Sequence, residues 1–231
     1  PPRENTPTTN MAIDLWMLRA FARPQCPRFR HYSWDRPCYT FGYGQDFAWV
    51  SEQTGATDEA LCRRPTGGGV VDHRDDWTYA LVIPASHPAA GSEIRATYQA
   101  LHGALGEALF SLGIQTKMIA PPSNSEGTDL PSAIPGKCFE EPVAHDLSRP
   151  EDGSKIAGAA MKRSREGLLL QGSVQKGLVG NIAWGQLAET FTERIAAFLG
   201  TDLERLDWGN GWEKDWQQFS MEIESATWQH R

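Results

Sequence analysis

An arginine pair followed by a glycine triplet constrains the fold of this chain more than any other feature. The segment is Arg63-Arg64-Pro65-Thr66-Gly67-Gly68-Gly69-Val70-Val71-Asp72-His73, and it leads into an apolar, strand-like stretch. Glycine adopts positive φ without steric cost, and successive free N–H groups in such a turn suit a carboxylate or phosphate. Arginine supplies fork-shaped donors for the same anions. The segment therefore predicts a tight turn that binds an anionic group, with a hairpin turn flanked by solvated charges as the alternative.

Size and composition indicate a folded protein with a sizeable core. The chain has 231 residues, of which 40% are hydrophobic, and it carries a net charge of −7. We expect one domain over residues 10–231, preceded by a flexible, proline-rich tail over residues 1–9. The acidic balance argues against a nucleic-acid partner. Because no apolar run approaches the ~20 residues of a membrane span, and no signal-peptide pattern is present, we expect a cytoplasmic protein without a membrane partner.

The four cysteines do not form a recognisable framework. They are Cys26, Cys38, Cys62 and Cys138, and no two are spaced as Cys-x-x-Cys. A disulfide scaffold or a structural zinc site is therefore not expected, and we predict no metal ligands. Free thiols in a reducing compartment are the expectation, which leaves at least one thiol available for chemistry.

Hydrophobic periodicity predicts an α+β fold with a mixed, largely antiparallel sheet packed with helices. Alternation is clearest in 77–84, and the best amphipathic helix spans 94–112, with Gly113 as its C-cap. The remaining predicted helices span 11–22, 48–54, 183–199 and 212–225, and the remaining predicted strands span 28–34, 39–43, 61–64, 69–72, 143–147, 154–159 and 167–174. We interpret 121–136 as a long loop.

A second motif follows at Gly153-Ser154-Lys155-Ile156-Ala157-Gly158-Ala159-Ala160. Together with the arginine–glycine segment, this lysine motif resembles the signature of the superfamily of lipoate–protein ligases, octanoyltransferases and biotin–protein ligases. Asn10-Met11-Ala12-Ile13-Asp14 and Gly42-Tyr43-Gly44-Gln45 are similar to its first helix and early turn. The resemblance implies the mixed sheet of the class II biotin/lipoate ligase catalytic domain and an enzyme of lipoate metabolism.

The resemblance also implies roles for individual residues. Lys155 would contact the carbonyl or carboxyl group of an acyl chain, and the glycine turn would lie over the acyl head group. The implied substrate-binding residues are Arg63, Arg64, Thr66, Gly67, Gly68, Gly69, His73, Gly158 and Ala159. Val70, Val71, Leu81 and Ile83 offer an apolar wall for the acyl tail, although they serve equally well as core residues.

Cys138 distinguishes the reactions that the superfamily offers. Its context, Cys-Phe-x-x-Pro before the lysine motif, resembles one octanoyltransferase branch. This implies that octanoyl passes from acyl carrier protein through a Cys138 thioester to a lysine of a lipoyl carrier domain, without a cofactor. Lys155 beside the thiol would favour the reactive thiolate. The alternatives are a lipoate ligase that uses ATP and Mg²⁺ to form a lipoyl adenylate, and a non-catalytic acyl-binding module.

The group that deprotonates the acceptor lysine is not identified by the sequence. His73 is a candidate general base, with a structural hydrogen-bonding role as the alternative. His145 and Asp146 could pair with Cys138, but they fall in a predicted strand that mostly packs. Asp76 is interpreted as solvated or loop-orienting. Gln171 stands where many relatives carry histidine, which implies a different pattern of donors and acceptors near the substrate.

Overall fold

The computed structural model describes residues 4–121, 143–206 and 213–230. The strands are β1 (Glu4–Asn5), β2 (Arg28–Trp34), β3 (Tyr39–Phe41), β4 (Leu61–Arg63), β5 (Val71–Asp72), β6 (Asp76–Pro84), β7 (Lys117–Met118), β8 (Leu147–Ser148), β9 (Lys155–Ser164) and β10 (Gly167–Gln175). The helices are α1 (Pro7–Arg19), α2 (Phe47–Thr54), α3 (Pro88–Gly91), α4 (Ile94–Ser111), α5 (Lys176–Val179), α6 (Trp184–Leu199), α7 (Glu213–Glu224) and α8 (Ala226–Gln229), with one 3₁₀ turn at Asp58–Ala60.

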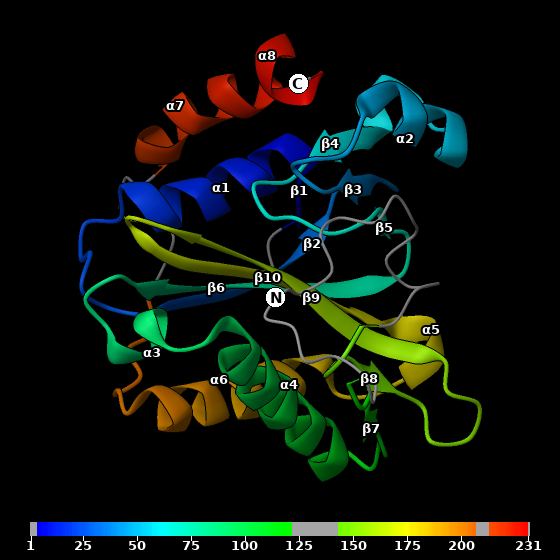
Figure 1. Cartoon of the computed structure of the whole chain (residues 1–231), viewed down its shortest axis with the longest axis vertical. Coiled ribbons are helices and arrows are strands. Elements are labelled where there is room, and N and C mark those ends of the chain that lie inside the picture. Colours follow the sequence, from blue (N-terminus) through cyan, green and yellow to red (C-terminus); the bar gives the residue numbers. More distant parts are fainter. Residues whose placement is uncertain (1–3, 122–142, 207–212, 231) are drawn as a thin grey trace.

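Two sheets organise the fold. The larger has seven strands in the order β1-β2-β6-β10-β9-β8-β7, and the smaller has three in the order β4-β3-β5 (Figure 1). Pairing is antiparallel throughout the large sheet except between β1 and β2, while β3 pairs parallel with β4. The predicted α+β class with a mixed, largely antiparallel sheet is confirmed.

Alternation along β6 builds the two cores. Trp77, Tyr79 and Leu81 face one side of the large sheet, where α4 and α6 cover them. Ala80 and Val82 face the other side, which α1, α7 and α8 cover (Figure 1). Both faces are thus buried, so β6 is apolar along almost its whole length rather than polar on one face.

Regular secondary structure begins at residue 4, before the position that the sequence predicted. Residues 1–9 were expected to be a flexible tail, but Glu4–Asn5 pairs with the end of β2, and α1 begins at Pro7. Thr6 caps this helix by accepting a hydrogen bond from the N–H of Thr9. Proline fits the first helical position because that N–H has no partner within the helix. The prediction is therefore wrong for residues 4–9, and residues 1–3 lie outside the described part.

A turn replaces most of the strand predicted at 143–147. Strand β8 contains only Leu147 and Ser148, and the residues before it turn around Asp146, whose carboxylate accepts a hydrogen bond from the N–H of Val143 (2.8 Å). His145 takes a positive φ of 72° in this turn. Histidine is among the few non-glycine residues enriched there. Asp146 therefore lies at the end of a turn and not in a regular strand.

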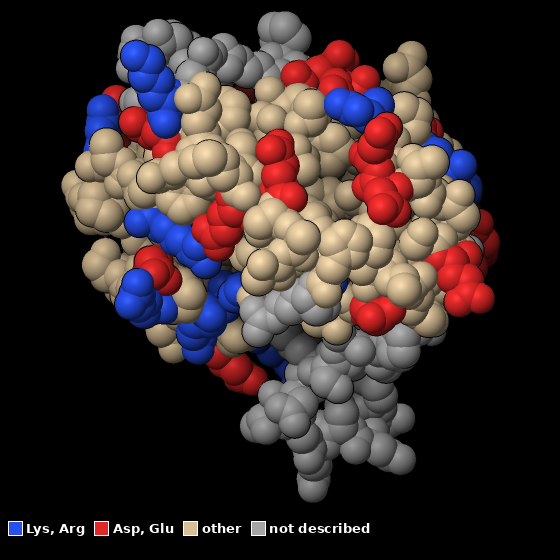
Figure 2. All heavy atoms as spheres, turned by 90° about the horizontal axis from the view of Figure 1, so that it is seen from above, with Lys and Arg blue, Asp and Glu red and all other residues tan. Residues whose placement is uncertain are grey.

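No helix within the described ranges is both long and apolar enough to cross a membrane. Figure 2 views the molecule from the top of Figure 1, and on this face acidic side chains are scattered while basic ones gather mainly toward one side. This face therefore lacks the uniformly basic surface, among its described residues, that suits a phosphate backbone.

A buried ion pair joins α1 to the large sheet. The guanidinium of Arg30 lies 2.7 Å from the carboxylate of Asp14, and the two side chains are 7% and 0% exposed. Arg30 also donates to the backbone carbonyl of Asn10 (2.6 Å), and Tyr32 donates its hydroxyl proton to Asp14 (3.1 Å). Because each charge is taken out of water, the pair is stable only with these additional hydrogen bonds.

Removing the cation of this pair should destabilise the protein. We expect Arg30→Met to cost about 3–5 kcal/mol of unfolding free energy, because the Asp14 carboxylate stays buried without it. Urea denaturation measures the loss. The control Arg36→Met removes an arginine from an exposed pair with Asp35 and should leave the midpoint unchanged. Equal effects of the two substitutions would contradict this role of Arg30.

Candidate active site

A pocket lies where the small sheet meets one face of the large sheet. The empty space between these walls, including the part that is open to solvent, is about 430 Å³. It is lined by Met11, Tyr32, Trp34, Thr40, Arg64, Val71, His73, Thr78, Lys155, Gly158, Ala159, Ala160, Gln171, Gly172 and Ser173. One part of this wall is apolar and the other carries a few polar groups, which suits a ligand with a polar head and an apolar tail.

Lys155 presents the pocket's ammonium group and is paired inside the protein. Its Nζ lies 2.8 Å from Oδ2 of Asp146, and the two side chains are 4% and 0% exposed. The other carboxylate oxygen accepts a hydrogen bond from the Tyr98 hydroxyl (2.5 Å). Burial, followed by the charge of Asp146, raises the pKa of Tyr98 well above its usual value. The hydroxyl therefore remains a donor that helps to hold the carboxylate in place.

Gly158 makes room for this lysine. A Cβ at residue 158 would lie 2.4 Å from Cε and 2.7 Å from Nζ of Lys155. The next residue, Ala159, is fixed because its backbone N–H donates to the Tyr98 hydroxyl oxygen (3.0 Å). The small residues of the lysine motif are thus a packing requirement: they let strand β9 pass directly beside a buried ammonium group.

The two arginines of the glycine segment hydrogen-bond to backbone carbonyls. Arg63 is fully buried, and its guanidinium donates to the carbonyls of Tyr43 and Gln45 (both 2.7 Å) and of Gln229 (2.9 Å). Arg64 lines the pocket and donates to the carbonyls of Gly67 (2.6 Å) and Gly69 (2.7 Å). Both residues therefore shape the turn and its surroundings.

The glycine turn packs against the early turn of the chain. A Cβ on Gly42 would lie 2.0 Å from the carbonyl oxygen of Gly68, which itself has a positive φ of 88°. Thr66 is buried and donates its hydroxyl proton to Oε1 of Gln171 (2.7 Å). Gln171 in turn donates to Oδ2 of Asp14 (2.6 Å). The glutamine therefore connects helix α1, the turn and strand β10 at the pocket wall.

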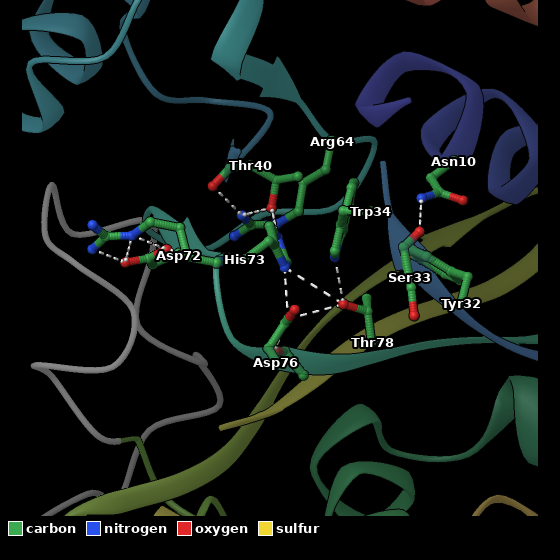
Figure 3. A network of polar contacts seen from close by, with 12 residues as sticks. Asn10, Tyr32, Ser33, Trp34, Thr40, Arg64, Asp72, His73, Asp76 and Thr78 are labelled. Carbon is green, nitrogen blue, oxygen red and sulfur yellow. Dashed lines mark hydrogen bonds and ion pairs between the residues drawn. The ribbon is translucent and has the colours of Figure 1, made fainter. Parts of the chain in front are cut away.

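His73 is held between two partners in Figure 3. Its Nδ1 lies 2.6 Å from Oδ2 of Asp76, and its Nε2 lies 2.8 Å from the Thr40 hydroxyl oxygen. Oδ2 of Asp76 also accepts hydrogen bonds from Thr78 (2.9 Å) and from Ser173. Because an ionised carboxylate only accepts, Nδ1 is the protonated nitrogen of the neutral ring and Nε2 is the acceptor. The imidazole thus faces the pocket in a defined tautomer.

Only part of the predicted site gathers at the pocket. Five predicted residues line it, namely Arg64, His73, Lys155, Gly158 and Ala159. Five others are not among the lining residues and lie in β4 or in the turn that follows it, namely Arg63, Thr66, Gly67, Gly68 and Gly69. Of the four predicted wall residues Val71 alone is among the lining residues, since Leu81 and Ile83 belong to the core under α4 and α6 and Val70 to the core of the small sheet. Cys138 lies outside the described residues.

Three polar residues of the site were not predicted. The sequence predicts Asp146 in a packing strand or paired with Cys138, interprets Asp76 as solvated or loop-orienting, and carries no signal for Thr40. The sequence signal for Asp146 is its position next to His145, shortly before the lysine motif, although only the fold shows that β8 and β9 are neighbours.

Within the described ranges there is no cluster of three or more His, Cys, Asp or Glu side chains that could hold a metal ion.

Comparison with known proteins places these features in one family. Residues 6–177 match the family model of the lipoyl protein ligase A/B catalytic domain. Octanoyltransferase LipM of Geobacillus kaustophilus (strain HTA426) is 30% identical over 171 residues, which are 73% of this chain and 61% of that protein. The chain thus spans about three fifths of the length of this curated relative.

Solved structures of lipoate ligases share the fold. Lipoate-protein ligase A bound with ATP superposes with a TM-score of 0.70 at 18% identity, over 99% of this chain and 96% of that one. The bipartite lipoate protein ligase of Thermoplasma acidophilum, whose structure was reported with its E2 lipoyl domain, gives 0.69 at 16% identity, over 99% and 94%. At such low identity the likeness shows the fold alone.

The ion pair of Lys155 can be tested by a double-mutant cycle. We expect Asp146→Asn to cost about 3–5 kcal/mol of unfolding free energy, because it takes the carboxylate away from a buried ammonium group. In a Lys155→Met background the same substitution should cost much less. Urea denaturation of the four proteins measures the coupling. A cost that is the same in both backgrounds would show that the pair does not contribute to stability.

The buried His102, whose ring lies 4.2 Å from the ring of Tyr98 between centroids, leads us to predict a loss of stability in acid. Burial lowers the pKa of this histidine from 6.5 to about 4. Between these values the unfolded chain binds a proton that the folded chain does not, so stability falls as the pH falls through this window. From pH 7 to pH 5 the loss assigned to His102 is about 2 kcal/mol.

The same pH series on a variant isolates this contribution. We expect His102→Gln to lose less stability than the wild type between pH 7 and pH 5, as measured by urea denaturation. The control His87→Gln removes a less buried histidine at the start of α3 and should keep the part of the acid loss that His102 causes. A wild-type slope in His102→Gln would contradict the assignment.

Proposed function

Because this chain belongs to the lipoyl protein ligase A/B catalytic domain family, we propose that it transfers an octanoyl or lipoyl-type acyl group to a lysine of a lipoyl carrier domain. The observation that carries the proposal is the buried Lys155 ammonium, which stands beside Gly158 at the wall of a partly apolar pocket. The LipM relatives, named octanoyltransferases, support acyl transfer as the reaction.

Lys155 acts on the acyl carbonyl oxygen in this proposal. The carbonyl carbon becomes tetrahedral when a nucleophile attacks it, and negative charge develops on its oxygen. An ammonium group that is already fixed in a water-poor pocket stabilises this charge without reorganising, and such a donor contributes about 10²–10³ in rate. Asp146, Tyr98 and Gly158 act through Lys155 by holding its side chain in position.

The acyl chain runs along the apolar part of the pocket in this proposal. Met11, Trp34, Val71, Ala159 and Ala160 supply that surface. Burying a methylene group contributes about 0.8 kcal/mol, so a chain of several methylenes binds chiefly through this wall. The polar head stays near Lys155, which gives the ligand one orientation.

Cys138 is the proposed nucleophile, and acyl carrier protein is the proposed donor. The Cys138 thiolate attacks the donor thioester, a new C–S bond forms, and the old C–S bond breaks to release the carrier's thiolate, which takes up the proton that Cys138 lost. The acceptor amine then displaces Cys138. The support is the sequence context of Cys138, 17 positions before Lys155 (155 − 138 = 17), and the names of the relatives. No cofactor is needed for this exchange.

An ATP-dependent lipoate ligase is the second candidate. It is favoured by the fold shared with lipoate-protein ligase A, whose structure contains ATP. A ligase would require Mg²⁺, which prefers carboxylate oxygens and water. None of the described residues that line the pocket is an aspartate or a glutamate. This part of the chain therefore offers Mg²⁺ no carboxylate ligand. A non-catalytic acyl-binding module is the third candidate.

Incubation with octanoyl-acyl carrier protein in the absence of ATP tests the proposal. We expect intact-mass spectrometry to show an octanoyl adduct on the wild type and none on Cys138→Ala. Lys155→Met and Gly158→Ala should slow the transfer of octanoyl to a lipoyl domain by about 10²–10³, because both remove the ammonium from its place. Cys26→Ala, which removes a partly buried thiol outside the pocket lining, should behave as the wild type.

Two results would contradict the transferase. Transfer that requires ATP and lipoate and that persists in Cys138→Ala would establish the ligase. Binding of octanoate without either product would establish the binding module.

A further inference from the structure

Transfer to a lysine requires a base, whichever donor supplies the acyl group. The acceptor side chain arrives as an ammonium ion, which has no lone pair to attack a carbonyl. One proton must therefore be removed before the C–N bond forms, whether the acyl group leaves a thioester or an adenylate. A side chain that can accept a proton at neutral pH must therefore lie within hydrogen-bonding distance of the amine nitrogen.

The pocket wall offers few groups that could accept this proton. The titratable side chains among its described residues are Tyr32, Arg64, His73 and Lys155. Arg64 is a donor only, and the Nζ of Lys155 is paired with the Asp146 carboxylate at 2.8 Å. The Tyr32 hydroxyl donates its proton to the Asp14 carboxylate, and burial raises the pKa of Tyr32 well above its usual value. His73 alone of these four presents a ring nitrogen that acts as an acceptor, because its Nδ1 bonds to Asp76 and its Nε2 accepts from the Thr40 hydroxyl.

The contacts of His73 suit a general base better than a purely structural link. Its Nδ1–H is directed to Oδ2 of Asp76 at 2.6 Å, which leaves the lone pair of Nε2 on the pocket side. The Asp76 carboxylate is fully buried, so its charge lies in a medium of low dielectric and stabilises the imidazolium strongly. His73 is 7% exposed, and Trp34 covers its ring at a centroid distance of 4.2 Å. The ring is therefore fixed in one orientation.

Two successive hydrogen bonds lead from Arg64 through Thr40 to Nε2 of His73. Arg64 donates to the Thr40 hydroxyl oxygen (3.3 Å), and that hydroxyl in turn bonds to Nε2 of His73 (2.8 Å). Thr40 and His73 both line the pocket (Figure 3). A substrate N–H can bond to Nε2 once the Thr40 hydroxyl has rotated away from it, and the His73 ring itself keeps its bond to Asp76.

We propose that His73, oriented by Asp76, is the general base that deprotonates the acceptor lysine. This inference rests on the proposed acyl transfer. The ammonium gives one proton to Nε2, the resulting amine attacks the acyl carbonyl carbon, the C–N bond forms, and the C–S bond to Cys138 breaks. The leaving thiolate takes the second proton that the nitrogen loses as the amide forms. The imidazolium then releases its proton to solvent and the cycle is complete.

The test compares two acceptors that differ in their need for a base. One is the lipoyl domain, whose lysine arrives charged, and the other is hydroxylamine, which is uncharged at neutral pH. Single-turnover transfer is followed from the acyl-enzyme by mass spectrometry. If the wild type forms no acyl-enzyme, octanoyl adenylate is supplied as the donor instead. Failure of the thioester step is thereby separated from failure of the base.

His73→Gln should slow transfer to the lipoyl domain by about 10²-fold or more, the usual contribution of a general base. Formation of the acyl-enzyme and its discharge by hydroxylamine should keep the wild-type rates. Asp76→Asn should show the same selective loss, because an amide can donate to Nδ1 and so favour the wrong tautomer. His87→Gln, a histidine outside the pocket lining, is the matched control and should be unaffected.

Three outcomes would overturn the proposal. The first is an equal loss with both acceptors in His73→Gln and Asp76→Asn, which would mean that the pair only holds the pocket in shape. The second is no loss with either acceptor. The third is a wild type that transfers the acyl group to no acceptor from either donor, in which case the proposed function fails as well.

Discussion

The buried pair of Lys155 and Asp146 is the interaction on which the candidate site depends. A lysine ammonium inside a protein needs a counter-ion and a place that excludes other atoms, and three separate segments meet to provide them. The turn before β8 supplies the carboxylate, α4 supplies the Tyr98 hydroxyl, and the glycine at 158 leaves the space. This charge is what gives a partly apolar pocket a polar end, and hence a direction for a ligand.

The second constraint is the close contact between the two glycine turns. The carbonyl of Gly68 comes so near to residue 42 that no side chain fits there. Arg63 and Arg64 hold these turns by bonding to their carbonyls, and the bond from Thr66 to Gln171 joins the glycine turn to β10. The histidine at the end of β5 and the threonine on β3 are thereby placed over the large sheet, where Asp76 meets them. The arginine–glycine segment therefore both holds the turns of the pocket in place and, through Arg64, lines it.

Sequence patterns predicted the fold class and the long strands and helices of both cores, because alternation and helical stripes follow directly from burial, but not the short helices α3, α5 and α8. They also predicted Lys155 and Gly158, which lie within one short motif. They did not predict the partners Asp146 and Asp76, since a carboxylate in a polar stretch has the same sequence signature whether it is solvated or buried. The anionic ligand expected at the arginine–glycine segment stays a prediction, and it illustrates a related limit. Whether a guanidinium binds a ligand or a carbonyl depends on which backbone groups the turn brings near it.

A crystal structure of the protein with octanoate tests the central claim most directly. The account predicts that a carboxylate oxygen of the ligand lies within hydrogen-bonding distance of Nζ of Lys155, with Asp146 still paired to it. The alkyl chain should run past Trp34, Val71 and Ala160. Octanoate bound elsewhere, or in this pocket with its carboxylate turned away from Lys155, would contradict the account.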